Sequence, residues 1–81
     1  MSGETIALEY PVKHQGHEYG QLAMRRPRVG DMLAADKQSG SDVEREIAMF
    51  SCLCEVPPEV VREMDMKDYR KLQEAYTGFL S

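Results

Sequence analysis

The stretch that most constrains the fold is Ser41–Cys54, which has the pattern of one amphipathic helix. Its apolar residues recur at positions i, i+4, i+7 and i+11, with one more beside them: Val43, Ile47, Phe50, Cys54 and Leu53. This spacing places them on one stripe of a helix with about 3.6 residues per turn. Ser41 can cap the first turn and Glu44 can reach back to it, which is the capping-box pattern. The sequence therefore predicts a core helix here.

The composition limits the class of protein. A length of 81 residues allows one domain with a small core, so we expect marginal stability alone or a partner that completes the core. The net charge of -4 argues against general nucleic-acid binding, which needs a basic surface. No apolar run is long enough to span a membrane, and no secretion signal precedes the first predicted strand. Cys52 and Cys54 lie two positions apart on one predicted helix, where they cannot form a disulfide, which fits reduced thiols in an intracellular protein.

Two segments near the start of the chain show the alternation of half-buried strands. Apolar residues occupy every second position of Glu4–Val12, and Leu22 and Met24 alternate in the same way within Tyr19–Arg26. The turn between them contains Gly16, which can adopt positive φ. The sequence predicts a β-hairpin over about residues 4–26.

The register of this hairpin follows from its apolar face. A two-residue turn would place Leu22 and Met24 on the face opposite to the apolar residues of the first strand. A loop of odd length, or a bulge, would instead pair Tyr10 with Leu22 and Leu8 with Met24 on one face. Because a slip of one residue reverses every side chain, we predict the odd loop or the bulge.

Helical signals follow the hairpin to the end of the chain. We predict four helices, over about residues 28–38, 41–55, 58–64 and 66–79. Pro27 and Pro58 favour helix starts, and Asp65 can cap the last helix. The fold class is α+β, with an N-terminal two-stranded antiparallel β-hairpin packed on a small bundle of three to four short α-helices. Residues 1–3 form a flexible tail, and residues 4–81 form a single domain.

No pattern of reactive side chains points to an enzyme or a metal site. His14 and His17 flank the turn, and Cys52 and Cys54 share a helix, but their spacing is wrong for a zinc finger. There is no nucleophile elbow and no phosphate-binding glycine loop. We therefore predict no catalytic residues, no cofactor and no metal.

The one dense positive cluster is Arg25, Arg26 and Arg28. It is compatible with a phosphate or RNA contact, with a solvated junction in which one arginine pairs with Asp31, or with docking of an acidic partner segment. A helix-turn-helix interpretation of the last two helices is weakened by Glu74 and by an aromatic stripe suited to packing.

Methionine is abundant for so short a chain. The five after Met1 are adaptable apolar groups, found in cores and on promiscuous binding surfaces: Met24, Met32, Met49, Met64 and Met66. Core filling is the favoured interpretation, with some of them exposed.

The ordered set of elements resembles a known family. A strand pair is followed by Met24–Lys37, then by Gly40–Phe50 and a break at Cys52–Glu59, and finally by Asp65–Tyr76 running into Gly78–Leu80. Over about residues 5–80 this order resembles the small tail assembly chaperones of Mu-like and related contractile-tailed phages and prophages.

The resemblance implies a non-enzymatic role in the cytoplasm of the host bacterium. Such proteins are expected to bind the tape measure protein, to keep it soluble before the tail tube polymerises, and to be absent from the mature virion. It also leaves open a homo-oligomer and a longer, frameshifted form of the chain as partners. No nucleic acid or membrane is expected among the partners.

The residues that we expect to contact the partner are the arginine junction and the end of the last apolar stripe: Arg25, Arg26, Arg28, Tyr76, Phe79 and Leu80. Long apolar helices aggregate if uncovered, and an acidic helical protein with exposed methionine and aromatic groups can cover them. The alternatives are a small DNA-binding or antitoxin-like regulator and a minor structural tail protein.

Overall fold

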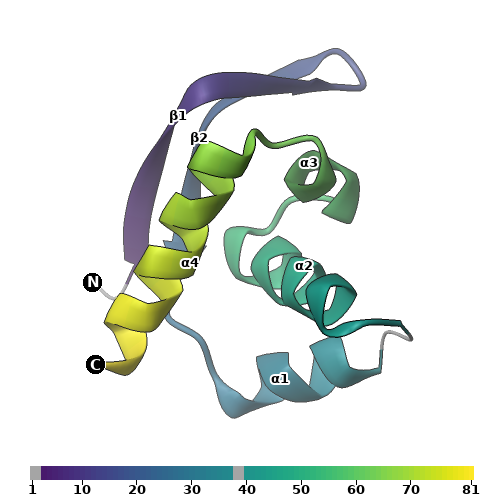
Figure 1. Cartoon of the computed structure of the whole chain (residues 1–81), viewed down its shortest axis with the longest axis vertical. Coiled ribbons are helices and arrows are strands. Elements are labelled where there is room, and N and C mark those ends of the chain that lie inside the picture. The colour runs from purple at the N-terminus through teal and green to yellow at the C-terminus, as the bar shows by residue number, and fades with distance from the viewer. Residues whose placement is uncertain (1–2, 38–39) are drawn as a thin grey trace.

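A computed structural model describes residues 3–37 and 40–81. The described residues form a two-stranded antiparallel hairpin followed by four helices, which confirms the predicted α+β class (Figure 1). The elements are β1 (Gly3–His14), β2 (His17–Arg25), α1 (Val29–Asp36), α2 (Asp42–Cys54), α3 (Pro58–Arg62) and α4 (Met66–Leu80). Helix α4 lies along β1, α2 contacts β2, and α3 contacts both β1 and α2. Helix α1 packs on α2 and lies at the opposite end of the molecule from the hairpin turn (Figure 1).

The hairpin combines a two-residue turn with a bulge. Gln15 and Gly16 have φ values of 50° and 79°, and the turn pairs His14 with His17. The pairing then shifts between Ala7 and Val12, which corresponds to a bulge in β1. The predicted bulge is confirmed, whereas a loop of odd length is not present.

The predicted residue pairs across the strands were wrong. Leu22 pairs with Ile6, and Met24 pairs with Glu4. The bulge lies after Ala7. Residues 3–7 of β1 therefore pair in one unbroken register with β2, in which Ile6 lies opposite Leu22. Leu22 and Met24 are buried as expected, whereas Tyr10 is 50% exposed.

The bulge is stabilised by a buried carboxylate on α4. Asp68 is fully buried, and its two oxygens accept hydrogen bonds from the backbone N–H groups of Glu9 and Tyr10, each at 2.9 Å. Lys71, one turn later, lies 3.2 Å from Asp68 and donates to the carbonyl of Ala7 at 3.0 Å. Desolvation opposes ionisation of Asp68, but these hydrogen bonds and Lys71 outweigh it, and the pKa of Asp68 is lowered. Two N–H groups of the bulge, those of Glu9 and Tyr10, are therefore satisfied by α4.

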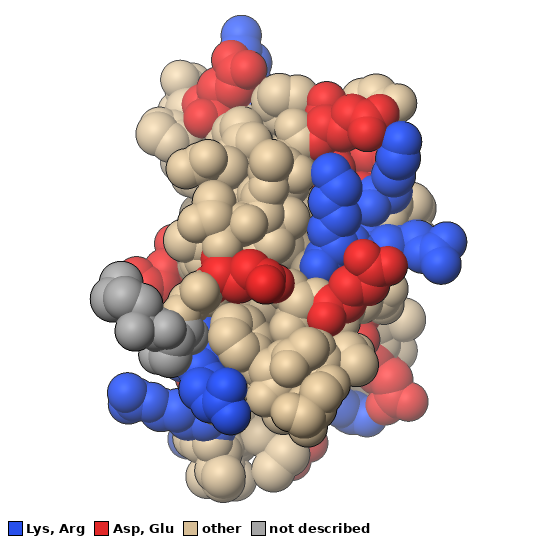
Figure 2. Space-filling model, turned by 90° about the vertical axis from the view of Figure 1, so that its left-hand side faces the viewer, with Lys and Arg blue, Asp and Glu red and all other residues tan. Residues whose placement is uncertain are grey.

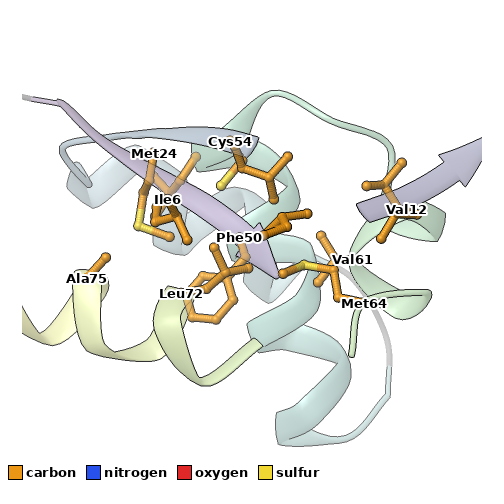
Figure 3. Close-up of a cluster of buried hydrophobic side chains, with 13 residues drawn as sticks. Ile6, Val12, Met24, Phe50, Cys54, Val61, Met64, Leu72 and Ala75 are labelled. Carbon is orange, nitrogen blue, oxygen red and sulfur yellow. The ribbon is translucent and has the colours of Figure 1, made fainter. Parts of the chain in front are cut away.

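The core lies between the hairpin and the three helices α2, α3 and α4 (Figure 3). Its most buried large side chains come from β2, α2, α3 and α4: Met24, Phe50, Leu53, Val60 and Leu72. Figure 3 shows the ring of Phe50 among residues of the strands and of α4, which makes α2 the central core helix that its stripe predicted.

The ends of the helices follow the local sequence signals. Ser41 and Asp65 are the N-cap residues of α2 and α4, and their side chains accept hydrogen bonds from Glu44 N and Lys67 N. Pro58 is in the first turn of α3. Val43 departs from the expectation, because it is 62% exposed in the first turn of α2 and the buried stripe begins further along.

Some predicted bounds differ from the observed ones. Helix α1 begins at Val29 rather than at residue 28, since Arg28 has extended backbone angles and is the N-cap. Gly3 was assigned to the flexible tail but is part of β1, where it pairs with Arg25. Helix α1 ends at Asp36 rather than at residue 38, and α3 ends at Arg62 rather than at residue 64. Residues 1–2 of the predicted tail lie outside the described residues. Among the described segments, none of the helices is long and apolar enough to cross a membrane.

Candidate partner-binding surface

Arg25 holds the junction between β2 and α1. Its guanidinium makes two hydrogen bonds to Asp31, at 2.8 and 2.6 Å, and Asp31 is almost completely buried. The Arg28 N–H donates to the same carboxylate at 2.8 Å. These bonds, with that of Arg25 the largest effect, lower the pKa of Asp31 to about 2 even though burial acts in the opposite direction. The structure therefore confirms one of the three interpretations of the arginine cluster, in which one arginine pairs with Asp31.

The three arginines differ in exposure and in their contacts. Arg25 is engaged with Asp31, whereas Arg26 and Arg28 are exposed. The Arg26 guanidinium lies 5.9 Å from the centre of the Phe79 ring, within range of a cation–π contact. The structure thus brings together Arg26 and the end of the last stripe, which the sequence had placed far apart.

The predicted residues at the end of α4 differ in exposure. Tyr76 and Phe79 are half-buried and pack against the core, and the Tyr76 ring contacts Phe50 edge-on with centroids 5.9 Å apart. Leu80 is 64% exposed. One side of these aromatic rings therefore belongs to the fold, and the rest is accessible.

Helix α1 has an apolar face that points outward. Val29, Met32 and Leu33 are 72%, 57% and 60% exposed, while Asp31 and Ala35 are its buried residues. We call these three residues the outer face of α1. Because positions i, i+3 and i+4 share one side of a helix, the ion pair of Asp31 directs the three large apolar residues to the surface.

A groove connects this face to the end of the last helix. It has a volume of about 250 Å³. Its lining residues come from α1, α2 and α4, and we call it the α1–α2 groove: Met32, Ala35, Asp36, Arg45, Glu46, Met49, Phe50 and Tyr76. Because Met32 on the outer face of α1 and Tyr76 near the end of α4 both line it, the groove lies between these two parts of the molecule.

The outer face of α1 was missed by sequence reasoning. The sequence predicts the helix that contains Val29, Met32 and Leu33 but assigns none of the three to the expected partner contacts. The sequence feature that could have indicated this face is Asp31, on the opposite side of the helix. Its carboxylate can accept hydrogen bonds from the N-cap residue and from a neighbouring arginine. A carboxylate held in that way requires the large apolar residues to lie on the other side.

The remaining reactive side chains are not grouped into a site. His14 and His17 lie at the hairpin turn, whereas Cys52 and Cys54 lie in α2. Burial raises the pKa of the Cys54 thiol to about 11, which makes it a poor nucleophile. In residues 3–37 and 40–81 no three potential metal ligands are close enough to hold an ion.

Charge on the side of the molecule that contains both termini is mixed. Figure 2 shows Lys and Arg interspersed with Asp and Glu, and uncharged residues between these groups. This face therefore lacks the continuous basic surface that nucleic-acid binding requires.

The family comparison agrees with the predicted resemblance. A model of the family described as "Phage tail assembly chaperone proteins, E, or 41 or 14" matches residues 5–81. The chain belongs to this family. Neither a curated protein nor a solved structure shows significant similarity to it. Membership of a tail assembly chaperone family implies protein partners in tail assembly.

Proposed function

We propose that this chaperone binds the tape measure protein of its phage and keeps it soluble until the tail tube polymerises around it. The observation that supports this proposal best is the outer face of α1, with three large apolar side chains more than half exposed on one short helix. A small protein gains nothing for its own fold from such a face, because burial of apolar area is what stabilises folding. The same face can remove a partner's apolar helices from water.

The site of action in this proposal is the cytoplasm of the host bacterium, and the role is non-enzymatic. The chaperone is released when the tube forms and is absent from the finished virion. Its net charge of -4 helps to keep the chaperone itself soluble, because molecules of like charge repel one another.

The proposed partner contacts are the outer face of α1 together with the predicted residues Arg26, Tyr76, Phe79 and Leu80. Arg25 acts in a different way, because its side chain donates hydrogen bonds to Asp31 and thereby fixes the position of α1, so that its replacement affects partner binding by displacing the outer face. Arg28 donates to Asp31 through its backbone N–H, which any substitution other than proline retains, and its exposed side chain belongs with the proposed contacts.

Co-expression with the tape measure protein of the same phage tests the proposal. We expect the wild-type chain to keep that protein in the soluble fraction and to co-purify with it. The double substitution Met32→Ser and Leu33→Ser weakens binding by about tenfold or more, because it removes two large apolar side chains from the interface.

Met66→Ser is the matched control. Met66 is 70% exposed at the start of α4, at the end of the molecule far from α1 (Figure 1). The proposal is rejected if the tape measure protein stays insoluble with the wild-type chain, or if the chain is found in purified virions.

A further inference from the structure

The floor of the α1–α2 groove can accept a large apolar side chain. Ala35, Met49 and Phe50 line it with carbon and sulfur atoms. Its volume of about 250 Å³ exceeds the cavity of about 150 Å³ that admits benzene in another protein. One leucine, methionine or phenylalanine side chain of a partner therefore fits.

The rim of the groove is negative. Arg45, the cation on the rim, already donates to the carboxylate of Asp42 and to the carbonyl of Gly40. Glu46 accepts hydrogen bonds from Tyr69 and Gln73, which are uncharged. Within the described parts of the chain no cation forms an ion pair with Asp36 or Glu46. These two carboxylates on either side of the groove are complementary to a positive partner.

The groove and the outer face of α1 are adjacent, since Met32 belongs to both. A partner that fills the groove with one side chain therefore meets further apolar surface within one helical turn. That arrangement suits a helix with apolar residues at i, i+3, i+4 and i+7.

We propose that the α1–α2 groove binds an amphipathic helix with a large apolar anchor and a Lys or Arg within one turn of it. This proposal rests on the proposed function, because it assigns that helix to the tape measure protein. The anchor occupies the floor formed by Ala35, Met49 and Phe50, and the basic residue lies against Asp36 and Glu46. Binding by this groove selects basic amphipathic segments over acidic ones of equal hydrophobicity.

Designed peptides test the selectivity directly. Two helical peptides of about 20 residues share one leucine stripe and differ only in having Lys or Glu beside it, and a third replaces the central leucine of the Lys peptide by alanine. We expect the Lys peptide to bind the chaperone at least about tenfold more tightly than the Glu peptide or the alanine peptide. NMR shifts on binding are expected at Ala35, Met49 and Tyr76.

A pair of charge reversals separates the groove from the general acidity of the chain. The substitutions are Asp36→Lys, in the last turn of α1, and Glu63→Lys, at the C-cap of α3. A lysine at either position interacts favourably with the negative end of the helix dipole. Both change the net charge equally. We expect Asp36→Lys to weaken binding of the Lys peptide by about three- to tenfold, and Glu63→Lys by less than about twofold.

Equal binding of the Lys and Glu peptides, equal effects of the two reversals, or shifts away from the groove would overturn this inference. If the wild-type chain still keeps the tape measure protein soluble in that case, the proposed function stands without it. If the Lys peptide binds the groove but the tape measure protein is not kept soluble, the proposed function fails and so does the assignment of the helix to that protein.

Discussion

Helices α4 and α1 use a carboxylate in their first turn in opposite ways. Asp68 is buried and joins α4 to the bulge of β1 by two backbone hydrogen bonds, while Leu72 on the same side is fully buried in the core. Asp31 joins α1 to Arg25, but the large apolar residues of α1 lie outside. One helix therefore contributes its apolar residues to folding, whereas the other leaves them available to a partner.

Replacing Asp68 gives the largest expected effect. Asp68→Ala leaves the N–H groups of Glu9 and Tyr10 without partners and removes the ion pair with Lys71, so we expect a loss of about 3 kcal/mol or more in the free energy of unfolding. Urea denaturation measures it. The control is the exposed N-cap change Asp65→Ala, expected to cost about 1 kcal/mol. Similar losses for both variants would contradict the structural role assigned to Asp68.

A matched pair of leucine substitutions compares the two helices directly. Leu72 is fully buried on α4 and Leu33 is 60% exposed on α1. We expect Leu72→Ala to cost about 3 kcal/mol, because it leaves a cavity, and Leu33→Ala to change stability by less than about 0.5 kcal/mol. Denaturation midpoints of the two variants provide the measurement. A large loss with Leu33→Ala would mean that α1 also contributes to the core.

The attachment of α1 is expected to depend on pH. The pKa of Asp31 is lowered from 3.8 to about 2, so its contribution to stability is complete above pH 4 and is lost as the pH falls toward 2. Hydrogen exchange between pH 2 and pH 5 follows this change at the α1 amides. Asp31→Asn is expected to lose about 2 kcal/mol at neutral pH and to abolish this part of the acid dependence. If exchange at the α1 amides of the wild type, corrected for intrinsic rates, does not change with pH, the assigned role of Asp31 in attaching α1 is wrong.

The smallest expected effect concerns the end of α2, the helix that both α1 and α4 adjoin. Glu55 has a φ of 55°, a left-handed conformation that glycine adopts with less strain. Glu55→Gly is expected to stabilise the fold by about 0.5 kcal/mol, measured as a rise in the thermal midpoint. A decrease would show that the contact of Glu55 with Arg25, at 4.0 Å, matters more than backbone strain.

The elements of this fold could be predicted because their signals are local. Ser41, Asp65 and Pro58 act within one turn of the residues that they cap or start. A change of register was also predictable, as either an odd loop or a bulge, because it places Leu22 and Met24 on the core face. These inferences required no knowledge of distant contacts.

The exposed face of α1 and the role of Asp68 could not be predicted in the same way. Asp68 follows the cap Asp65 by three residues and has the pattern of an ordinary first-turn acid, but its partners lie at the other end of the chain. The contact of Arg26 with Phe79 likewise joins distant segments. The end of α4 was among the partner contacts expected from the sequence. The outer face of α1 was not, because its exposure is evident only from the structure, in which Asp31 faces inward.

The hydrogen bonds between Asp68 and the β1 bulge also constrain the order of events during translation. Glu9 and Asp68 are separated by 59 positions, which a ribosome covers in roughly 3–12 s. Until then the N–H groups of the bulge remain bonded to water, and Tyr76, which completes the α1–α2 groove, has not yet been added. A nascent chain therefore receives Tyr76, the last residue that lines the groove, only after Asp68, which secures the hairpin, has been added.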